Sequence, residues 1–588
     1  MTDEPKQDAG QPKLTAVEGI KLASHGLRGQ IGHELEENKD HFNEESAQLL
    51  KHHGTYQQDD RDTRTARKKA GLDRDYKFML RTKFPGGLIT AEQYLACHDL
   101  SGKYGQSDLR VTSRQCFQFH GIVRKKLRPL IHDLNLFAKI TSLGACGDVV
   151  RNTCAPPVAD IDLSYKDCTT DLQELSRQIS AHFLPTTTSY FDIWIDDEQV
   201  TINADGTLKY KSHEPSKETV DPIYGTTYLP RKFKIGLATD FDNSVDVYTN
   251  DGGVIAITEN GKVVGYDILA GGGLGYTHRK AETYPRLADH IAFVETLDEV
   301  IPVLEAIVKV QRDNGGRADR RQARLKYLMD KIGVEAFQQK VYEYYGRPLA
   351  KPRGVKPSAQ PHYLGWHKQI QPGLNYVGLW IENGRIRDFE GSFQFRTGLH
   401  EIVSKFKPSV RLTAHHNLVL ADIKDADVAE VKQLLAKYLI PTNEGVSTIR
   451  KLEMACPALP FCGLAMAESE RAMPGLIKAV EDAGHGDADV IIRMSGCPNG
   501  CSRPRSAEIG IVGFGADQYQ VFTGGDYLGA RLNELLFDKV KGADLPGVLS
   551  SMLSQWKAGR TGNERFGDWS HRVGVEALQS SVSATPAS

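Results

Sequence analysis

The feature that most constrains the fold is a pattern that occurs twice in the chain. An order of strand, turn, helix and strand in the first 150 residues recurs later, and residues 109–122 align with residues 410–423 at a constant offset. The alignment superposes two pairs of residues, Arg110 on Arg411 and Thr112 on Thr413. A shared element order with weak identity indicates an internal duplication. The simplest fold for such a chain is a pseudo-two-fold body with a ligand at the junction of its halves.

Length and composition exclude several classes of protein. A chain of 588 residues predicts about three to five domains, and 40% hydrophobic with 25% charged residues is typical of a globular protein. The net charge of -2 argues against a general nucleic-acid binder. The start of the chain lacks the apolar stretch of a secretory signal, and no stretch is long and apolar enough for a membrane span. We expect a cytoplasmic protein that binds neither nucleic acid nor membrane.

The order of predicted elements indicates a mixed α/β (α+β) protein in six segments. The predicted segments are a charged N-terminal arm (1–77), the first half of the duplicated domain (78–144), an α/β domain (145–350), the second half (351–424), a cysteine-bearing α/β domain (425–578) and a disordered tail (579–588). The arm is charge-dense, which is typical of a solvated helical segment with little core, although it could instead wrap its own domain.

Four of the nine cysteines form a distinct group. They are Cys456, Cys462, Cys497 and Cys501, spaced C-x5-C and C-x3-C in a 46-residue window. In a large non-secreted chain this grouping indicates a zinc site or an iron–sulfur cluster rather than disulfides. Zinc pairs normally have two to four intervening residues, so the spacing favours the cluster. The other five cysteines are expected to be small buried hydrophobes.

The second cysteine pair lies in a tight turn, "MSGCPNGCSRP". The segments before and after it, "ADVIIR" and "AEIGIVGF", read as buried strands. Gly496 and Gly500 would let the backbone approach a bulky object closely. We therefore expect a strand-to-strand loop that holds its sulfurs rigidly.

Polar residues alternate along "LRVTSRQCFQFHG". The alternation predicts one strand face with Arg110, Thr112, Arg114, Cys116, Gln118 and His120. Such a face is either solvated or a surface for carboxylates, which Arg binds bidentately. A second basic run holds Arg231, Lys232 and Lys234, where an edge strand guarded by lysines is an equal alternative. Arg81 and Arg151 complete the set of candidate anion-binding residues.

Together these motifs resemble the siroheme sulfite and nitrite reductase family, in particular the hemoprotein subunit of its assimilatory sulfite reductases. The resemblance rests on "ACPALPFCGLAMAESER", "RMSGCPNGCSRPRSAEIGIVG", "RVTSRQCFQFHG", "YLPRKFK" and "GGGL", and runs from about residue 54 to 575. It implies ferredoxin-like halves at 78–144 and 351–424, with three α/β domains around siroheme. The segments 145–350 and 425–578 would then bind siroheme with substrate and the iron–sulfur cluster, respectively.

The resemblance also implies roles for individual residues. Cys456, Cys462, Cys497 and Cys501 would bind one [4Fe–4S] cluster, and Cys501 would also ligate the siroheme iron. The implied siroheme contacts are Arg110, Thr112, Arg114, Gln118, His120, Arg231, Arg324, Lys326 and Asn499. Arg324 stands where relatives carry Lys, which keeps the charge. The implied substrate pocket consists of Arg81, Arg151, Lys232 and Lys234. Its arginines would fix the oxyanion and its lysines donate protons, with pKa values lowered by mutual repulsion.

The implied reaction is the six-electron reduction of sulfite to sulfide in sulfur assimilation and cysteine biosynthesis. Nitrite reduction is the alternative in the same family, and a non-catalytic iron–sulfur or zinc protein that binds nucleic acid is the alternative from another class. The glycine-rich segment "GGGL" at 271–274 lacks the spacing of a dinucleotide-binding loop, so electrons must come from a partner protein. The resemblance implies an NADPH-oxidising flavoprotein subunit, with ferredoxin as the alternative, and the 1–77 arm as a candidate docking segment.

Overall fold

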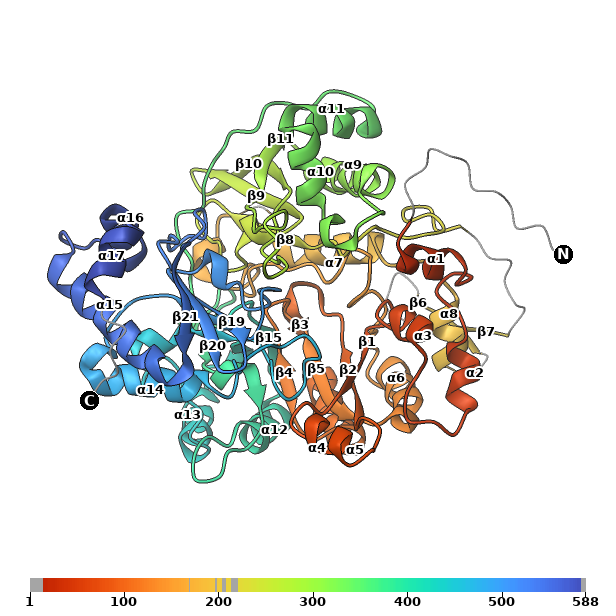
Figure 1. Cartoon of the computed structure of the whole chain (residues 1–588), viewed down its shortest axis with the longest axis horizontal. Helices are drawn as coiled ribbons and strands as arrows, with labels where there is room; N and C mark the ends of the chain where they lie inside the picture. The colour runs from red at the N-terminus through yellow and green to blue at the C-terminus, as the bar shows by residue number, and fades with distance from the viewer. Residues whose placement is uncertain (1–13, 169, 196–197, 203–207, 213–219, 583–588) are drawn as a thin grey trace.

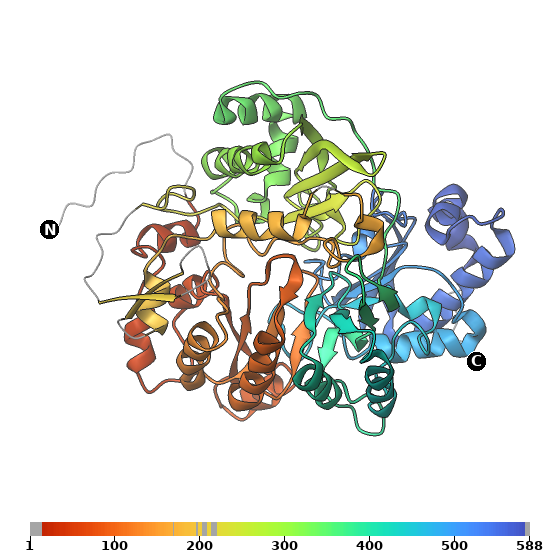
Figure 2. The ribbon, with the colours of Figure 1, turned by 180° about the vertical axis from the view of Figure 1, so that it is seen from behind.

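The computed structural model describes residues 14–168, 170–195, 198–202, 208–212 and 220–582. Figure 1 shows the two duplicated halves, in orange and teal, below a green middle domain, with the blue C-terminal domain beside them. Figure 2 shows the same arrangement from behind. One hydrophobic core runs through both halves and the middle domain, whereas the C-terminal domain has a separate core.

The first half is a five-stranded antiparallel sheet with strand order β1-β2-β5-β4-β14. Its strands are β1 (Thr55–Asp59), β2 (Tyr76–Arg81), β5 (Phe117–Ile122), β4 (Leu109–Val111) and β14 (Arg385–Ile386). Helices α5 (Ala91–Tyr104) and α6 (Leu127–Leu136) pack against each other on this half. Thr90 caps α5 in a capping box. Its side chain accepts a hydrogen bond from the backbone nitrogen of Gln93, and the Gln93 side chain accepts one from the backbone nitrogen of Thr90.

The second half repeats this sheet position for position, in the order β12-β13-β16-β15-β3. Its strands are β12 (Gly365–Lys368), β13 (Leu374–Leu379), β16 (Leu418–Lys424), β15 (Ser409–Leu412) and β3 (Leu88–Ile89). Helices α12 (Phe395–Phe406) and α13 (Val428–Lys437) correspond to α5 and α6. The matching strand orders confirm the internal duplication.

The two halves exchange their shortest strands. Strand β3 precedes α5 in the chain but pairs with β15 of the second half, and β14 pairs with β4 of the first half. The register sets Arg385 opposite Arg110, and Leu88 opposite Arg411. Each half therefore completes the edge of the other's sheet.

The described part of the N-terminal segment belongs to the body of the protein. It forms α1 (Ala16–Leu22), α2 (Ile31–Glu36), α3 (Glu44–Leu49), β1 and α4 (Arg64–Lys69). Leu27, Ile31, Phe42 and Leu50 are buried in the main core, and β1 is a strand of the first sheet. The expectation of a solvated arm with little core is therefore wrong for residues 14–77, because apolar residues spaced among the charges face inward. Residues 1–13 lie outside the described part.

The middle domain is a four-stranded sheet with order β11-β10-β9-β8, in which only β8 and β9 run parallel. Its strands are β8 (Ile235–Thr239), β9 (Gly252–Glu259), β10 (Lys262–Ala270) and β11 (Asp289–Val294), and a separate hairpin consists of β6 (Glu198–Ile202) and β7 (Leu208–Ser212). The helices of this region are α7 (Leu172–His182), α8 (Ser189–Trp194), α9 (Leu297–Asn314), α10 (Leu325–Ile332) and α11 (Val334–Tyr345).

The C-terminal domain is a five-stranded mixed sheet with order β17-β18-β19-β20-β21. Its strands are β17 (Met454–Ala455), β18 (Ile492–Ser495), β19 (Ile509–Gly515), β20 (Gln518–Thr523) and β21 (Glu534–Lys541). Its helices are α14 (Met473–Val480), α15 (Leu545–Gly559), α16 (Phe566–Val573) and α17 (Val575–Ser581). Helix α17 includes the first three residues of the expected tail at 579–588, and residues 583–588 lie outside the described part.

Candidate active site

Parallel strands bring the two cysteine pairs to one edge of the C-terminal sheet. Strand β17 runs parallel to β18, with Ala455 opposite Met494. Cys456 directly follows β17, and Cys497 lies two residues beyond the end of β18. Because parallel strands end at the same edge, both cysteine loops start there. The turn with Cys497 and Cys501 connects β18 to β19, which confirms the predicted strand-to-strand loop.

The four thiols lie close enough to influence one another. Burial, followed by a negative charge on Cys501, raises the pKa of Cys456, Cys462 and Cys497 to about 12. Buried thiolates that repel one another need a bound metal to stay deprotonated. The backbone nitrogen of Gly496 donates to the Cys456 sulfur over 3.2 Å, and the Asn499 side chain donates to the Cys497 sulfur over 3.4 Å.

The spread of the four sulfurs favours a cluster over a single zinc ion. Zinc with bonds of about 2.3 Å would hold its sulfurs within about 4 Å of one another. Among the described residues, three or more candidate ligand atoms lie within 4.8 Å of one another only at His98, Asp99 and His400. No three of the four cysteine sulfurs lie as close together as a single zinc ion requires, whereas a larger inorganic cluster does not require that closeness.

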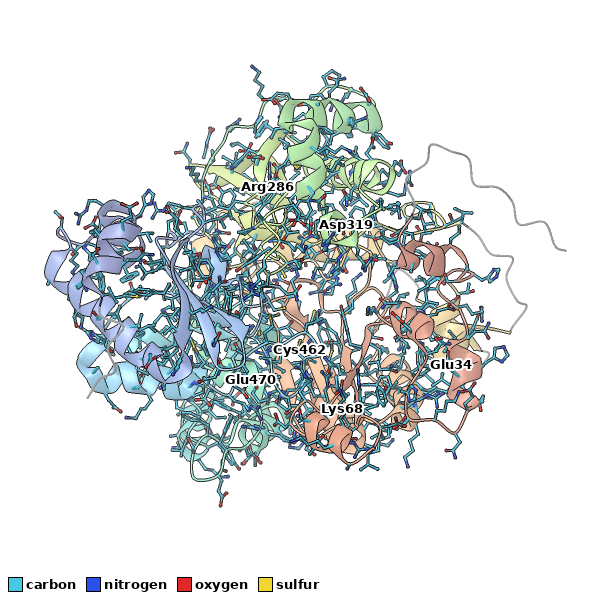
Figure 3. The ribbon with its side chains drawn as sticks, viewed as in Figure 1. Glu34, Lys68, Arg286, Asp319, Cys462 and Glu470 are labelled. Atoms are coloured by element: carbon cyan, nitrogen blue, oxygen red, sulfur yellow. The ribbon has the colours of Figure 1, made fainter. Side chains whose placement is uncertain are left out.

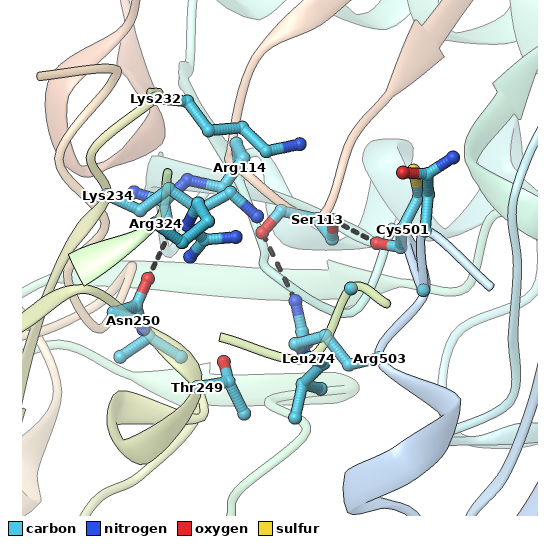
Figure 4. Close-up of a pocket in the computed structure, with 14 residues that line it drawn as sticks. Ser113, Arg114, Lys232, Lys234, Thr249, Asn250, Leu274, Arg324, Cys501 and Arg503 are labelled. Carbon is cyan, nitrogen blue, oxygen red and sulfur yellow. Dashed lines mark hydrogen bonds between the residues drawn. The ribbon is translucent and has the colours of Figure 1, made fainter. Parts of the chain in front are cut away.

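A pocket opens between the cysteine turn, the first duplicated turn and the middle domain. Its cavity volume is about 30 Å³. Ser113 and Arg114 of the first half line it together with Cys501 and Arg503 of the cysteine turn. The remaining lining residues come from the middle domain, apart from Asn499 and Gly500, and are Lys232, Lys234, Val245, Thr249, Asn250, Leu274, Gly275 and Arg324. Figure 4 shows the charged ends of Lys232, Lys234, Arg114 and Arg324 gathered on the side of the pocket across from Cys501.

Burial, together with neighbouring positive charge, lowers the pKa of both pocket lysines. Burial is the largest cause for Lys232, whose pKa is well below its usual range, followed by Arg231, Arg151 and Lys234. Burial, Arg324 and Arg114 lower the pKa of Lys234 to about 7. Repulsion from neighbouring cations thus adds to the effect of burial, but Arg81 is not among the cations that act on either lysine. Both lysines are only partly exposed and line the pocket, which disfavours the alternative of a solvated edge strand.

Arg81 and Arg151, the two arginines expected in the substrate pocket, are not among the residues that line the described pocket, and they lie near Tyr56, which the sequence analysis did not consider. The Nη2 atom of Arg151 lies 3.5 Å from the hydroxyl oxygen of Tyr56. The Nε and Nη2 groups of Arg151 also donate to the carbonyl oxygen of Gly147. Arg81 Nε is buried without a hydrogen-bond partner among the described residues. Its guanidinium lies within electrostatic range of Cys146, Tyr56 and Cys116 and, more weakly, of Cys501.

The predicted polar face of the first half divides between two environments. Strand β4 ends at Val111, so the alternation stops there. Thr112 uses its hydroxyl to accept from the backbone nitrogens of Arg114 and Cys116, both over 3.2 Å, and thereby shapes the turn. Arg114 reaches the pocket, donating to Asn250 over 2.6 Å and leaving its Nε buried without a partner in the described chain.

Arg110 and His120 face the first cysteine loop instead of the pocket. Arg110 donates to Glu470 over 2.8 Å and to the carbonyl of Ala455 over 2.6 Å. The His120 ring lies 4.7 Å from the ring of Phe461, beside Cys462. Gln118, in register with both Arg81 and Arg110, has a buried side-chain oxygen without a partner in the described chain.

Arg324 and Lys326 bind the glycine-rich loop at 271–275. Arg324 donates to Asp251 over 2.8 Å and remains at the pocket wall. Lys326 is fully buried and donates to the carbonyls of Gly273, Gly275 and Tyr284. All three donors of Lys326 are thus engaged with backbone, and its role here is to hold the loop.

A buried carboxylate behind the pocket was not predicted from the sequence. Asp148 accepts two bonds from Arg320, over 2.8 and 3.0 Å, and lies 3.6 Å from Lys21 and 3.8 Å from Arg231. Lys51 belongs to the same charged group, since burial and then Arg320 lower its pKa to about 8. Lys21, Lys51 and Arg320 lie in charged segments that are typical of solvated helices, so no local signal distinguished them.

The fold and the site define a class of protein: a duplicated α/β body that holds a cation-lined pocket beside four grouped cysteines. The comparisons with known proteins agree with this class. The model described as "Nitrite/Sulfite reductase ferredoxin-like half domain" matches residues 72–137 and 367–438. The model described as "Nitrite and sulphite reductase 4Fe-4S domain" matches residues 174–349, which end before the four cysteines.

Curated relatives match almost the whole chain. The chain is 41% identical to "Sulfite reductase [NADPH] subunit beta" of Schizosaccharomyces pombe, covering 97% of this chain but 39% of that protein's length. It is 38% identical to "Sulfite reductase [ferredoxin]" of Synechococcus elongatus, covering 97% and 91% of the two chains. It is also 38% identical to "Sulfite reductase [NADPH] hemoprotein beta-component" of Oceanobacillus iheyensis, covering 97% and 96%.

Among solved structures, the NirA protein of Mycobacterium tuberculosis shares the fold, with a TM-score of 0.77 and 24% identity over 97% of this chain and 98% of that one. The chain belongs to the nitrite and sulfite reductase family. This membership confirms the predicted family and fold class, and it favours a reductase over the alternative of a non-catalytic iron–sulfur or zinc protein that binds nucleic acid. In the part of the chain that the structure describes, no helix has the length and apolar character needed to cross a membrane.

Proposed function

We propose that this chain is the hemoprotein component of an assimilatory sulfite reductase, which reduces sulfite to sulfide with six electrons. The observation that carries the proposal is the buried group of cations beside Cys501, whose lysines have lowered pKa values. Uncompensated buried cations are costly, and the pocket therefore requires anions. An anionic tetrapyrrole and an oxyanion substrate supply them.

The residues present fit both implied cofactors. Cys456, Cys462, Cys497 and Cys501 would hold the [4Fe–4S] cluster. Arg114, with an unpartnered buried Nε, and Arg324 line the pocket and would pair with siroheme carboxylates. Arg231, which acts on Lys232, is the third proposed partner. Siroheme, when bound, would pass electrons from the cluster to the substrate sulfur.

Within this proposal the pocket side chains divide the work of binding and protonation. Arg81 and Arg151 are the proposed groups that fix the oxyanion. Lys234, with a pKa of about 7, can give up a proton near neutral pH. The pKa of Lys232 is also lowered, by burial and by neighbouring cations. A bound anion raises the pKa of a nearby lysine, so both lysines are charged once siroheme and substrate occupy the pocket.

Electrons reach the chain from a separate protein in this proposal. Relatives of nearly equal length carry either NADPH or ferredoxin in their names. We favour an NADPH-oxidising flavoprotein subunit, because the hemoprotein beta-component names imply a second subunit. Cys462 is partly exposed, and its neighbour Leu464 is 68% exposed, so this loop is the proposed point of electron entry.

The test is a measurement on the purified holoprotein. We expect Soret and long-wavelength chlorin bands in the absorption spectrum. We also expect about four cluster iron atoms per chain and an equal amount of acid-labile sulfide. With an artificial one-electron donor, kcat/KM should be higher for sulfite than for nitrite. A preference for nitrite would overturn the substrate, and a colourless protein would overturn the cofactors.

A further inference from the structure

The exchanged strand β14 brings a buried arginine, Arg385, next to the loop that carries Cys456 and Cys462. Arg385 is 2% exposed. Its Nε and Nη2 donate to the two carboxylate oxygens of Glu470 over 2.7 and 2.9 Å, and its Nη1 lies 3.1 Å from Asp108. This is the forked geometry by which Arg fixes a carboxylate in one orientation.

Glu470 connects this arginine to the first cysteine of the loop. Its backbone nitrogen donates to the carbonyl oxygen of Cys456 over 3.1 Å. Its carboxylate also accepts from Arg110, whose remaining bond goes to Ala455, the residue before Cys456. The backbone on both sides of the Cys456 α-carbon is therefore held by groups that Arg385 orients.

The other end of the loop is held by ring contacts. Phe461, the residue before Cys462, lies with its ring centroid 5.1 Å from the Arg385 guanidinium and 4.7 Å from the His120 ring. A cation over an aromatic face is attracted to the ring quadrupole, more so when both are shielded from water. Arg385 thus contacts, directly or through one residue, both ends of the segment that carries Cys456 and Cys462.

The duplication supplies an internal comparison. In the second half, the position opposite Arg411 is occupied by Leu88, whereas in the first half the position opposite Arg110 is Arg385. Arg411 instead pairs with Asp160. An arginine therefore occupies the exchanged strand only in the half that meets the cysteine loop.

We infer that Arg385 is a positioning residue, supplied by the second half-domain, that holds the loop between Cys456 and Cys462 in the conformation that receives the inorganic cluster. The inference rests on the proposed role of these cysteines as cluster ligands. The charges balance, because Arg110 and Arg385 face Glu470 and Asp108 in a buried group. Removing one cation leaves a buried carboxylate unpaired, which loosens the loop.

The test measures cluster retention in the holoprotein under anaerobic conditions. A ferrous chelator is added to wild type, Arg385→Gln and Arg385→Lys, and iron release is followed together with the electron paramagnetic resonance spectrum of the reduced cluster. We expect release from Arg385→Gln to be at least tenfold faster, with an altered spectrum. Arg385→Lys keeps the charge but not the fork, so its rate should lie between the two.

The matched control is Arg411→Gln, which removes an equally buried arginine and its carboxylate pair from the other half. It should lower the melting temperature without changing iron release or the spectrum. If Arg385→Gln does not fold, Phe461→Leu removes the ring contact alone and should still accelerate release.

Wild-type rates and spectra in both Arg385→Gln and Phe461→Leu would overturn the inference, as would equal acceleration in Arg411→Gln. A wild-type protein without iron and acid-labile sulfide would instead overturn the proposed function, so the two failures are distinguishable.

Discussion

Ser113 donates its hydroxyl hydrogen to the carbonyl oxygen of Cys501 over 2.9 Å, although the two residues are 388 positions apart in the chain. The bond joins the first duplicated turn to the cysteine turn. Arg503 strengthens the junction, because it donates to the carbonyls of Ser113 over 3.2 Å and Ala414 over 2.9 Å. Ser113 and Ala414 occupy equivalent places in the two copies of the repeat, so one side chain holds both halves against the cysteines.

Replacing Cys501 tests the ligand assignment. We expect Cys501→Ser to lose the coupling between siroheme and cluster and nearly all sulfite reduction, because the shared sulfur is removed. The measurements are the visible spectrum, iron content and turnover. Cys97→Ala is the control, since Cys97 is buried in helix α5 among apolar residues. A Cys501→Ser protein with a normal spectrum and activity would contradict the assignment.

Replacing the pocket lysines tests their part in proton delivery. Lys232→Met and Lys234→Met should keep both cofactors and slow sulfite reduction by roughly a hundredfold or more, the usual scale of lost acid catalysis. Nitrite carries less charge, so its reduction should suffer less. Lys262→Met, at an exposed position on β10, should leave turnover unchanged. Unchanged sulfite turnover in both pocket variants would leave Arg81 and Arg151 as the proposed anion-binding residues.

Asp148→Asn should destabilise the protein by about 3–5 kcal/mol, because the change leaves buried cations without their counter-charge. Arg320, Lys21 and Arg231 hold the pKa of Asp148 well below its usual range. The carboxylate therefore contributes stability that is present above about pH 4 and is lost as the pH falls further. Denaturant titration at pH 7 gives the difference. Asp489→Asn, which breaks an exposed pair with Arg565, should cost less than about 1 kcal/mol.

At Glu453 we expect stability to change with pH in the direction opposite to that at Asp148. Burial raises its pKa to about 8, and neither carboxylate oxygen has a hydrogen-bond partner among the described residues. Between about pH 4.3 and 8 the folded state holds a proton that the unfolded state has lost, so stability falls as the pH rises. Glu453→Gln cannot ionise and should show a flatter profile of melting temperature against pH. Parallel profiles for the two proteins would refute this, and the exposed Glu335→Gln serves as the control.

The sequence predicted the fold better than the direction of individual side chains. The repeat at 109–122 and 410–423 foretold two matching sheets, but the strand exchange involves β3 and β14, each two residues long, which carry no periodicity. Alternation placed Arg110 and Arg114 on one face, yet β4 ends between them and they face different partners. The cysteine group was found because its spacing is chemically specific. Figure 3 shows side chains with nitrogen and oxygen atoms spread over the described part of the chain. Charged residues make up 25% of the sequence, so Lys51 and Arg320 could not be singled out by pattern.

The exchange of β3 and β14 has a consequence for synthesis on the ribosome. The first sheet lacks its last strand until residue 386 has been made, and β3 remains an unpaired extended segment until Ser409–Leu412 follows. The nascent first half must therefore wait, with one open sheet edge, for more than half of the chain to emerge. Contacts so distant in sequence form slowly, and open edges invite association with other chains. A chaperone that shields the first half during translation would act at this edge.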